Sequence, residues 1–146
     1  MKAMILHTVG EPLELEEIPI PQPNKNQLLL EVKSCGICRT DLHIIDGELE
    51  NPDLPLVLGH QVVGIVKEVG ETVSGFSEGN KVGVPWLGYT CGDCEFCCSD
   101  QENLCNSAQF TGYDINGGFA EYTVADAHFC FPIPDRYPAL QAAPLL

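Results

Sequence analysis

Basic side chains are scarce in this chain. Only 7 of its 146 residues are Lys or Arg, against 21 Asp or Glu, so the formal net charge is -14. A surface of that sign repels nucleic-acid phosphates and anionic lipid headgroups, so we expect neither a nucleic-acid nor a membrane partner. The acids are dispersed along the chain, which is typical of a solvated surface and not of an acidic tail.

Long apolar runs are missing as well. No stretch is long enough to span a bilayer, and the segment Met1–His7 has too short an apolar run and no cleavage site for a secretory signal. The sequence also lacks internal repeats and low-complexity linkers. With 45% hydrophobic residues, we expect one soluble cytoplasmic domain with its own core over residues 1–146.

Short β-rich runs, separated by prolines and glycines, dominate the sequence. They are Lys2–Val9, Leu13–Ile18, Gln27–Lys33, Gln61–Val69, Lys81–Leu87, Phe119–Ala125 and His128–Ile133. Two stretches differ: Arg39–Asp46 is expected to be a short helix, and a second helix is expected to begin within Tyr137–Leu146. This pattern predicts a mainly β fold, either a barrel or a sandwich.

Cysteine, by contrast, is abundant. The chain has eight, an even number that could form four disulfides in an oxidising compartment. A chain of this length with an ordinary apolar fraction does not need such cross-links, so we favour metal ligation in a reducing cytoplasm.

Four of the cysteines follow the spacing C-x2-C-x2-C-x7-C. They are Cys91, Cys94, Cys97 and Cys105. Two intervening residues allow a tight turn to direct both sulfurs inward, and Gly92 gives that turn its backbone freedom. Soft thiolates at four tetrahedral corners favour structural zinc, with an iron–sulfur cluster or disulfides as the alternatives. We therefore expect a zinc lobe over about residues 88–106, shaped by its metal and not by apolar packing.

The other cysteines have separate interpretations. Cys98 directly follows Cys97, so its side chain is expected to point elsewhere as a free thiol. Cys35 and Cys130 are interpreted as small, buried apolar residues. Cys38 and His60 could be two ligands of an open, catalytic metal site, although an isolated Cys and an isolated His are more often core residues.

Five segments now point to a known family. They are Cys38-Arg39-Thr40-Asp41-Leu42-His43, then Gly59-His60-Gln61-Val62-Val63-Gly64-Ile65-Val66-Lys67-Glu68-Val69-Gly70, then Gly79-Asn80-Lys81-Val82-Gly83, the four-cysteine segment, and Gly117-Gly118-Phe119-Ala120-Glu121-Tyr122. In this order they resemble the medium-chain zinc alcohol dehydrogenases, most closely the bacterial and yeast-type branch. The resemblance covers the whole chain and implies a GroES-like, partly open β-barrel as the catalytic domain.

The resemblance also implies a role for individual residues. Cys38 and His60 would be ligands of the catalytic zinc, and Asp41 would orient His60 through its other ring nitrogen. Thr40 would hydrogen-bond the alcohol oxygen, and His43 would carry its proton onward to solvent. Further, Arg39 would contact the pyrophosphate of NAD or NADP, and Trp86 would line the substrate pocket. Leu49 stands where yeast-type relatives often have tryptophan, which suggests a roomier pocket.

Simpler interpretations stay open for some of these residues. Thr40 and Asp41 could be an ordinary helix N-cap, and Trp86 could be a core residue. Gln61 departs from the family, which usually has Glu directly after the ligand histidine. That change puts in doubt any part for the carboxylate in zinc ligand exchange, but it removes no ligand.

Two features of the family are missing from this chain. The third catalytic ligand would be a cysteine soon after a segment like Gln141–Leu146, and no segment matches the Gly-x-Gly-x-x-Gly turn that seats a dinucleotide. We therefore expect a catalytic-domain fragment without its nucleotide-binding domain, inactive alone. The intact enzyme, expected to be a homo-oligomer, would oxidise small alcohols or reduce aldehydes with NAD(P). A zinc reductase of larger aldehydes, a zinc-stabilised binding module without catalysis and a secreted disulfide protein are the alternatives.

Overall fold

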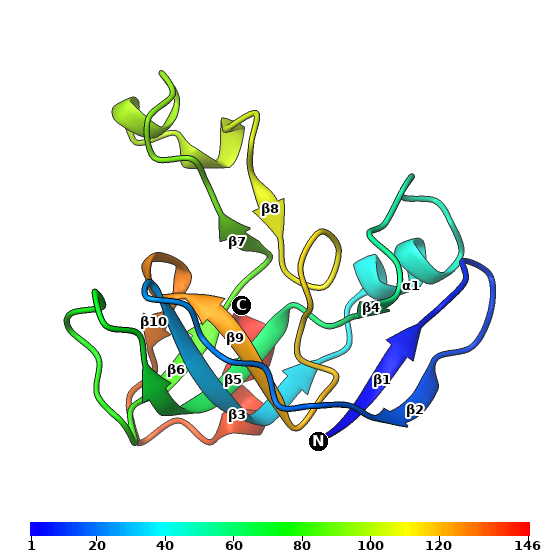
Figure 1. The fold of residues 1–146 in the computed structure, drawn as a ribbon, viewed down its shortest axis with the longest axis horizontal. Coiled ribbons are helices and arrows are strands. Elements are labelled where there is room, and N and C mark those ends of the chain that lie inside the picture. Colours follow the sequence, from blue (N-terminus) through cyan, green and yellow to red (C-terminus); the bar gives the residue numbers. More distant parts are fainter.

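The computed structural model describes all of residues 1–146 and is mainly β, with two short α-helices (Figure 1). The strands are β1 (Lys2–Leu6), β2 (Glu14–Glu17), β3 (Gln27–Gly36), β4 (Leu56–Val57), β5 (Gln61–Val69), β6 (Lys81–Val84), β7 (Leu87–Tyr89), β8 (Gln109–Phe110), β9 (Tyr122–Asp126) and β10 (Phe131–Pro132). The α-helices are α1 (Arg39–Ile45) and α2 (Ala139–Ala142). Single 3-10 turns lie at Cys97–Ser99, Glu102–Leu104, Ala127–Phe129 and Ala143–Leu145. None of the helices is both long and apolar enough to cross a membrane.

Five antiparallel strands, in the order β10-β6-β5-β3-β9, form the body of the molecule. The sheet is curved like a barrel. Its two outer strands, β10 and β9, are not paired with each other, so the barrel stays partly open. The long pair β3–β5 shifts register between Leu29 and Leu30 and again between Val32 and Ser34. Such irregularities bend a strand, which allows the sheet to wrap around its contents.

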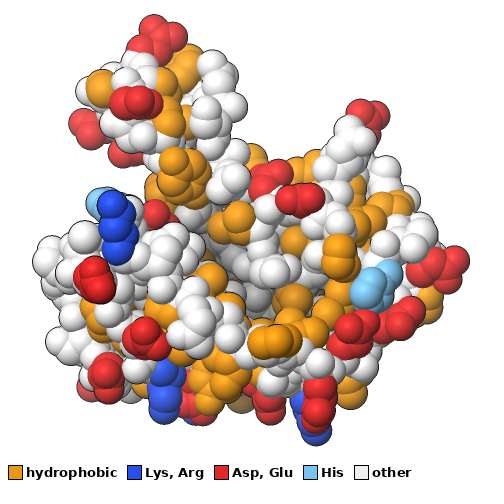
Figure 2. All heavy atoms as spheres, viewed as in Figure 1, with side chains coloured by type: hydrophobic (Ala, Val, Ile, Leu, Met, Phe, Trp, Pro, Cys, Tyr) orange, Lys and Arg blue, Asp and Glu red, His pale blue; other side chains and the backbone are white.

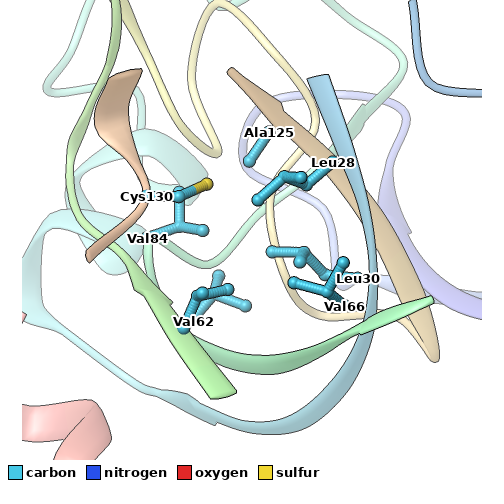
Figure 3. Close-up of a cluster of buried hydrophobic side chains, with 8 residues drawn as sticks. Leu28, Leu30, Val62, Val66, Val84, Ala125 and Cys130 are labelled. Atoms are coloured by element: carbon cyan, nitrogen blue, oxygen red, sulfur yellow. The ribbon is translucent and has the colours of Figure 1, made fainter. Parts of the chain in front are cut away.

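Side chains from all five strands or their flanks fill the barrel. The buried members are Leu28, Leu30, Val62, Val66, Val82, Val84, Ala125 and Cys130 (Figure 3). Leu28 and Leu30 face the same side because alternate residues of a strand do so, and the same holds for Val82 and Val84. Burying each Leu or Val stabilises the fold by about 1.5–3 kcal/mol, so this cluster fixes the curved sheet that carries the candidate site.

A smaller sheet, in the order β2-β1-β4, lies beside the barrel and supports α1. Ile44 of α1 packs with Leu6 of β1, Leu56 of β4 and Leu58 in a buried cluster. This packing holds the short helix beside the segment that leads into β5.

Strands β7 and β8 form a narrow ribbon, with Leu87 opposite Phe110 and Tyr89 opposite Gln109. The chain between them, residues 90–108, forms the tip of a projection that stands clear of the barrel (Figures 1 and 2). We call residues 88–106 the cysteine lobe. Within it Cys105 and Gly88 are the only buried residues, so the lobe has almost no apolar core.

The mainly β expectation is confirmed, but several elements differ from the sequence-based prediction. The strand expected at Lys81–Leu87 is two strands, β6 and β7, because Pro85 has no N–H to continue the ladder. The strand expected at His128–Ile133 was wrong for its first part, because Ala127–Phe129 is a 3-10 turn. The Asp126 carboxylate accepts the His128 N–H in this turn, and only Phe131–Pro132 is strand. Strands β4 and β8 were not predicted.

Candidate metal centres

The cysteine lobe brings four sulfurs to one point. The Sγ atoms of Cys91, Cys94, Cys97 and Cys105 all lie within 4.8 Å of one another. The separations are 3.5 Å for Cys94–Cys97, 3.5 Å for Cys105–Cys91 and 3.9 Å for Cys91–Cys97. No sulfur is close enough to another for a disulfide, and all eight cysteines are free.

These separations fit a single tetrahedral ion. Four sulfurs about 2.3 Å from one zinc are about 3.8 Å from one another. A multi-iron cluster would need the sulfurs further apart, to leave room for several metal atoms. Gly92 adopts a left-handed conformation, with φ +78°, in the turn between Cys91 and Cys94. The backbone N–H of Ser107 points at the Cys105 sulfur over 3.4 Å, as suits a thiolate.

The ionisation of the cluster also fits a cation. The backbone N–H of Cys97 favours the Cys94 thiolate, but desolvation and the neighbouring sulfurs of Cys97 and Cys91 outweigh it and raise the pKa of Cys94 to about 11. A metal ion among the sulfurs removes this penalty, because it binds the deprotonated ligands.

The second candidate centre lies where α1 begins. Cys38 is the residue before the helix and has an extended backbone, with φ -111° and ψ 158°. Its sulfur lies 3.6 Å from the Thr40 hydroxyl oxygen. The Thr40 backbone N–H, then its hydroxyl and then the His60 ring lower the pKa of Cys38, because each favours the thiolate.

His60 reaches the same place from the start of β5. Gly59, directly before it, has φ +93°, and a Cβ there would lie 2.5 Å from the Phe119 ring and 2.7 Å from the Cys35 sulfur. Only glycine fits this approach. Burial lowers the pKa of His60, but Asp41 and Cys38 outweigh burial and raise it above its ordinary value. His60 is 5% exposed, and its Nδ1, which faces the Asp41 carboxylate, has no hydrogen-bond partner.

Asp41 is buried between the two candidate ligands, 1% exposed. One carboxylate oxygen accepts the Cys38 N–H at 2.8 Å, and the other accepts the Gly59 N–H at 3.1 Å. Its Oδ1 lies 3.6 Å from Nδ1 of His60, so the carboxylate faces the ring at a distance longer than a hydrogen bond. Asp41 therefore fixes the backbone on both sides of the site, and it acts on His60 through its charge. The helix-capping interpretation describes its hydrogen bonds better.

The remaining residues singled out in the sequence lie on α1, on the apolar cluster behind it and at the start of β5. Arg39 is exposed at the start of α1, and Thr40 is half-buried. His43 lies one turn further along the helix and pairs with Glu48. Leu49 packs against the cluster of Leu6, Ile44, Leu56 and Leu58. The Gln61 side chain lies over Gly36 at the end of β3, since a Cβ on Gly36 would be 2.4 Å from Gln61 Oε1.

An aromatic wall flanks His60. The Trp86 ring stands edge-on to the imidazole with centroids 4.9 Å apart, and it stacks on Phe110 at 5.0 Å and on Tyr113 at 5.9 Å. Tyr113 in turn donates a hydrogen bond to the Glu50 carbonyl. Phe110 and Tyr113 were missed in the sequence, because β8 is only two residues long and neither residue lies in a metal or catalytic motif.

Comparison with known proteins agrees with this arrangement. The family model described as "Alcohol dehydrogenase GroES-like domain" matches residues 24–135. An alcohol dehydrogenase of Moraxella sp. (strain TAE123) is 41% identical over 147 residues, which cover 100% of this chain and 44% of that protein. Among solved structures, a cinnamyl alcohol dehydrogenase of Sorghum bicolor superposes with TM-score 0.90 and 32% identity, over 99% of this chain and 44% of that one. A cobalt- and zinc-bound thermostable alcohol dehydrogenase from Pyrobaculum aerophilum superposes with TM-score 0.90 and 30% identity, over 99% of this chain and 44% of that one.

A curved β-barrel of this topology with a cysteine lobe is a GroES-like domain. The chain belongs to the alcohol dehydrogenase GroES-like domain family, as the resemblance of its motifs indicated. It spans less than half of the length of the curated relatives that it matches.

Proposed function

We propose that this chain is the catalytic domain of a zinc- and NAD(P)-dependent alcohol dehydrogenase, which interconverts an alcohol and an aldehyde or ketone. The observation that carries the proposal is the meeting of Cys38 and His60, from different elements, beside the Thr40 hydroxyl. A binding module without catalysis has no use for a hydroxyl at this point. The relatives are alcohol dehydrogenases by name, which supports the same reaction.

Cys38 and His60 would hold the catalytic zinc, as two of the three protein ligands that such a site takes. The third would come from outside residues 1–146. When bound, the zinc supplies Lewis acidity that lowers the pKa of an alcohol, and the nicotinamide supplies the hydride acceptor. The lowered pKa of the Cys38 thiol, to which the His60 ring contributes, suits a pair of cation ligands.

The other residues would handle the proton and the reactants. Thr40 would accept a hydrogen bond from the alcohol hydroxyl, and His43 would release that proton at the surface, where Glu48 would help it to carry the charge. Arg39, exposed at the start of α1, would bind the cofactor pyrophosphate. Trp86 and Leu49 would bound the substrate pocket and limit the size of the alcohol.

The cysteine lobe would hold a second, structural zinc on Cys91, Cys94, Cys97 and Cys105. All four positions would be filled by protein, so this ion would stabilise the lobe and take no part in the reaction. A nucleotide-binding domain outside residues 1–146 would complete a homo-oligomeric enzyme. We place that enzyme in the cytoplasm, since eight free cysteines suit a reducing compartment.

Hydride transfer by the enzyme that contains this chain and a nucleotide-binding domain is the test, followed as NAD(P)H absorbance with short and aromatic alcohols. Thr40→Val keeps the shape of the side chain and removes the hydroxyl, so kcat/KM should fall about 10²–10⁴-fold. Thr8→Val, on an exposed loop after β1, should leave kcat/KM unchanged. Full activity in Thr40→Val, or no hydride transfer with any alcohol, would overturn the proposal.

A further inference from the structure

Tyr113 has no part in the proposed function so far, although it contacts the aromatic wall beside the candidate catalytic centre. Its ring stacks on Trp86 with centroids 5.9 Å apart, and the Trp86 ring stands 4.9 Å from the His60 imidazole. Its hydroxyl donates a hydrogen bond to the carbonyl of Glu50, which lies 63 residues earlier in the sequence. Tyr113 therefore connects the wall to a loop that is distant along the chain.

This loop, residues 48–54, lies between α1 and β4 and has few other attachments. Its first two N–H groups donate to a carbonyl in the last turn of α1. Further along, two hydrogen bonds join residues 50–53 to the rest of the protein, and both go to Tyr113. The Tyr113 hydroxyl donates to the Glu50 carbonyl, and the Tyr113 carbonyl accepts the Asp53 N–H at 3.4 Å. Tyr113 is thus the main tether of the loop.

The turn that carries Tyr113 has a fixed place in the fold. It follows β8, and within it the Phe110 N–H donates to the Asp114 carboxylate at 2.8 Å. Gly112 has φ +74°, and a Cβ there would lie 2.8 Å from the backbone nitrogen of Gly59. The turn therefore packs directly against the backbone that leads into β5, so it can serve as an anchor for the loop.

Leu49 is the loop residue that the tether holds in place, since it directly precedes Glu50. Its side chain, Trp86 and Tyr113 all pack against the buried cluster of Leu6, Ile44, Leu56 and Leu58. In the proposed function Leu49 and Trp86 bound the substrate pocket. The ring and the hydroxyl of Tyr113 therefore link one wall of that pocket to the other.

We propose that Tyr113 is a positioning residue that makes the enzyme select alcohols by size. Its hydroxyl keeps the Leu49 wall from moving away from the Trp86 wall, so a bulky alcohol cannot push the two apart. Apolar pockets with fixed walls discriminate by about 10–200-fold for one methylene, and this discrimination is lost when a wall can yield. The inference rests on the proposed function and adds to it the residue that fixes the dimensions of the pocket.

The test compares Tyr113→Phe with the unmodified enzyme that contains this chain and a nucleotide-binding domain. The variant keeps the ring and loses the hydroxyl tether. The ratio of kcat/KM for cyclohexylmethanol to kcat/KM for ethanol should rise roughly tenfold. The change should appear mainly in KM, because the reacting groups are untouched. Tyr137→Phe removes an exposed hydroxyl on the loop before α2 and should leave the ratio unchanged. A ratio that Tyr113→Phe does not alter, or an equal loss with both alcohols, would overturn the proposal.

A second comparison tests whether Tyr113 acts through Leu49. Leu49→Ala removes the wall itself and should raise the same ratio. When Tyr113→Phe is added to Leu49→Ala, little further rise is expected, because the wall that the tether holds is already gone. Full and independent effects of the two changes would contradict a role of Tyr113 through Leu49.

Limited proteolysis of the 146-residue chain measures the tether without any activity. A glutamate-specific protease should cut after Glu50 severalfold faster in Tyr113→Phe, because the loop opens more often. Cutting after Glu78, on an exposed turn before β6, is the internal control and should keep its rate. Equal cutting after Glu50 would also overturn the proposal. Activity with an unaltered ratio would refute only the role of Tyr113, whereas no hydride transfer with any alcohol would refute the proposed function itself.

Discussion

Asp41 is a buried carboxylate that ties together the two segments of the candidate catalytic centre, through the N–H groups of Cys38 and Gly59. Asp41→Asn keeps the shape but presents an amide NH2 to one of these donors. We expect it to lower the free energy of unfolding by about 1–3 kcal/mol in urea denaturation. Glu68→Gln, an exposed change on β5, should cost under about 0.5 kcal/mol. An equal effect of the two changes would contradict the role given to Asp41.

The buried thiol of Cys130 makes stability depend on alkaline pH. Desolvation raises its pKa from 9.0 to about 12, so above pH 9 the unfolded thiol ionises while the folded one stays protonated. The stability that this group contributes is complete below pH 9 and is lost progressively as the pH rises towards 12.

Cys130→Ala should therefore flatten the fall in unfolding free energy between pH 9 and the onset of alkaline unfolding. The measurement is urea denaturation at a series of pH values. Thr8→Val, which removes no ionisable group, should keep the original slope. A slope that Cys130→Ala leaves unchanged would show that the thiol is accessible to solvent.

Single residues differ in how far the sequence predicts them. Spacing alone singled out the four lobe cysteines, because ligands close in sequence must meet if the turn between them is tight. The hydrogen bonds of Asp41 could not be predicted, since one partner, Gly59, approaches through tertiary packing. Phe110 and Tyr113 reach Trp86 in the same way, and no local pattern marks them.

At the scale of elements, the turn before β5 decides where His60 lies. Gly59 and Gly10 both have left-handed φ, +93° and +86°, but only at Gly59 would a Cβ meet other atoms. Gly10→Ala should cost about 1 kcal/mol of conformational strain. Gly59→Ala should cost about 1–3 kcal/mol more, because the Phe119 ring and the Cys35 sulfur must move.

Urea denaturation of the two glycine variants measures this difference. Equal losses would mean that the clash at Gly59 is relieved without cost, and that the close approach does not hold His60 in place.

The cysteine lobe is an element whose order we ascribe to the proposed structural zinc. Chelation of the zinc should increase amide hydrogen exchange in residues 88–106 and leave β3 and β5 protected, since the barrel has its own core. Cys97→Ser should reproduce the effect of the chelator, and Cys98→Ser should not. Uniform exchange across the lobe and the barrel would contradict a lobe that depends on metal for its fold.

Long periodic elements were predicted better than short ones. The strand expected at Gln61–Val69 matches β5 residue for residue, because its run of Val and Ile has both the length and the propensity of a buried strand. Strands β4 and β8 have two residues each, which is too short for any periodicity. Each forms where the chain runs beside another strand, β1 for β4 and β7 for β8. A local sequence pattern does not show which segments become neighbours in the fold.

For the molecule as a whole, the two candidate centres occupy unlike surroundings. One lies among buried groups between α1 and β5, where Asp41 and His60 are almost fully enclosed. The other sits on a projection without an apolar core, and acidic side chains are visible over its surface (Figure 2). The enclosed site suits chemistry on a substrate, and the projecting one suits a structural ion.

Trp86 allows the enclosed centre to be tested directly, because it is the only tryptophan of the chain and its ring is 4.9 Å from that of His60. With the cysteine lobe filled by zinc, excess Co²⁺ should quench Trp86 fluorescence by binding at Cys38 and His60. Cys38→Ser should abolish most of the quenching, and Cys130→Ala should retain it. Quenching that is absent from the unmodified chain, or that survives Cys38→Ser in full, would contradict a metal centre at Cys38 and His60.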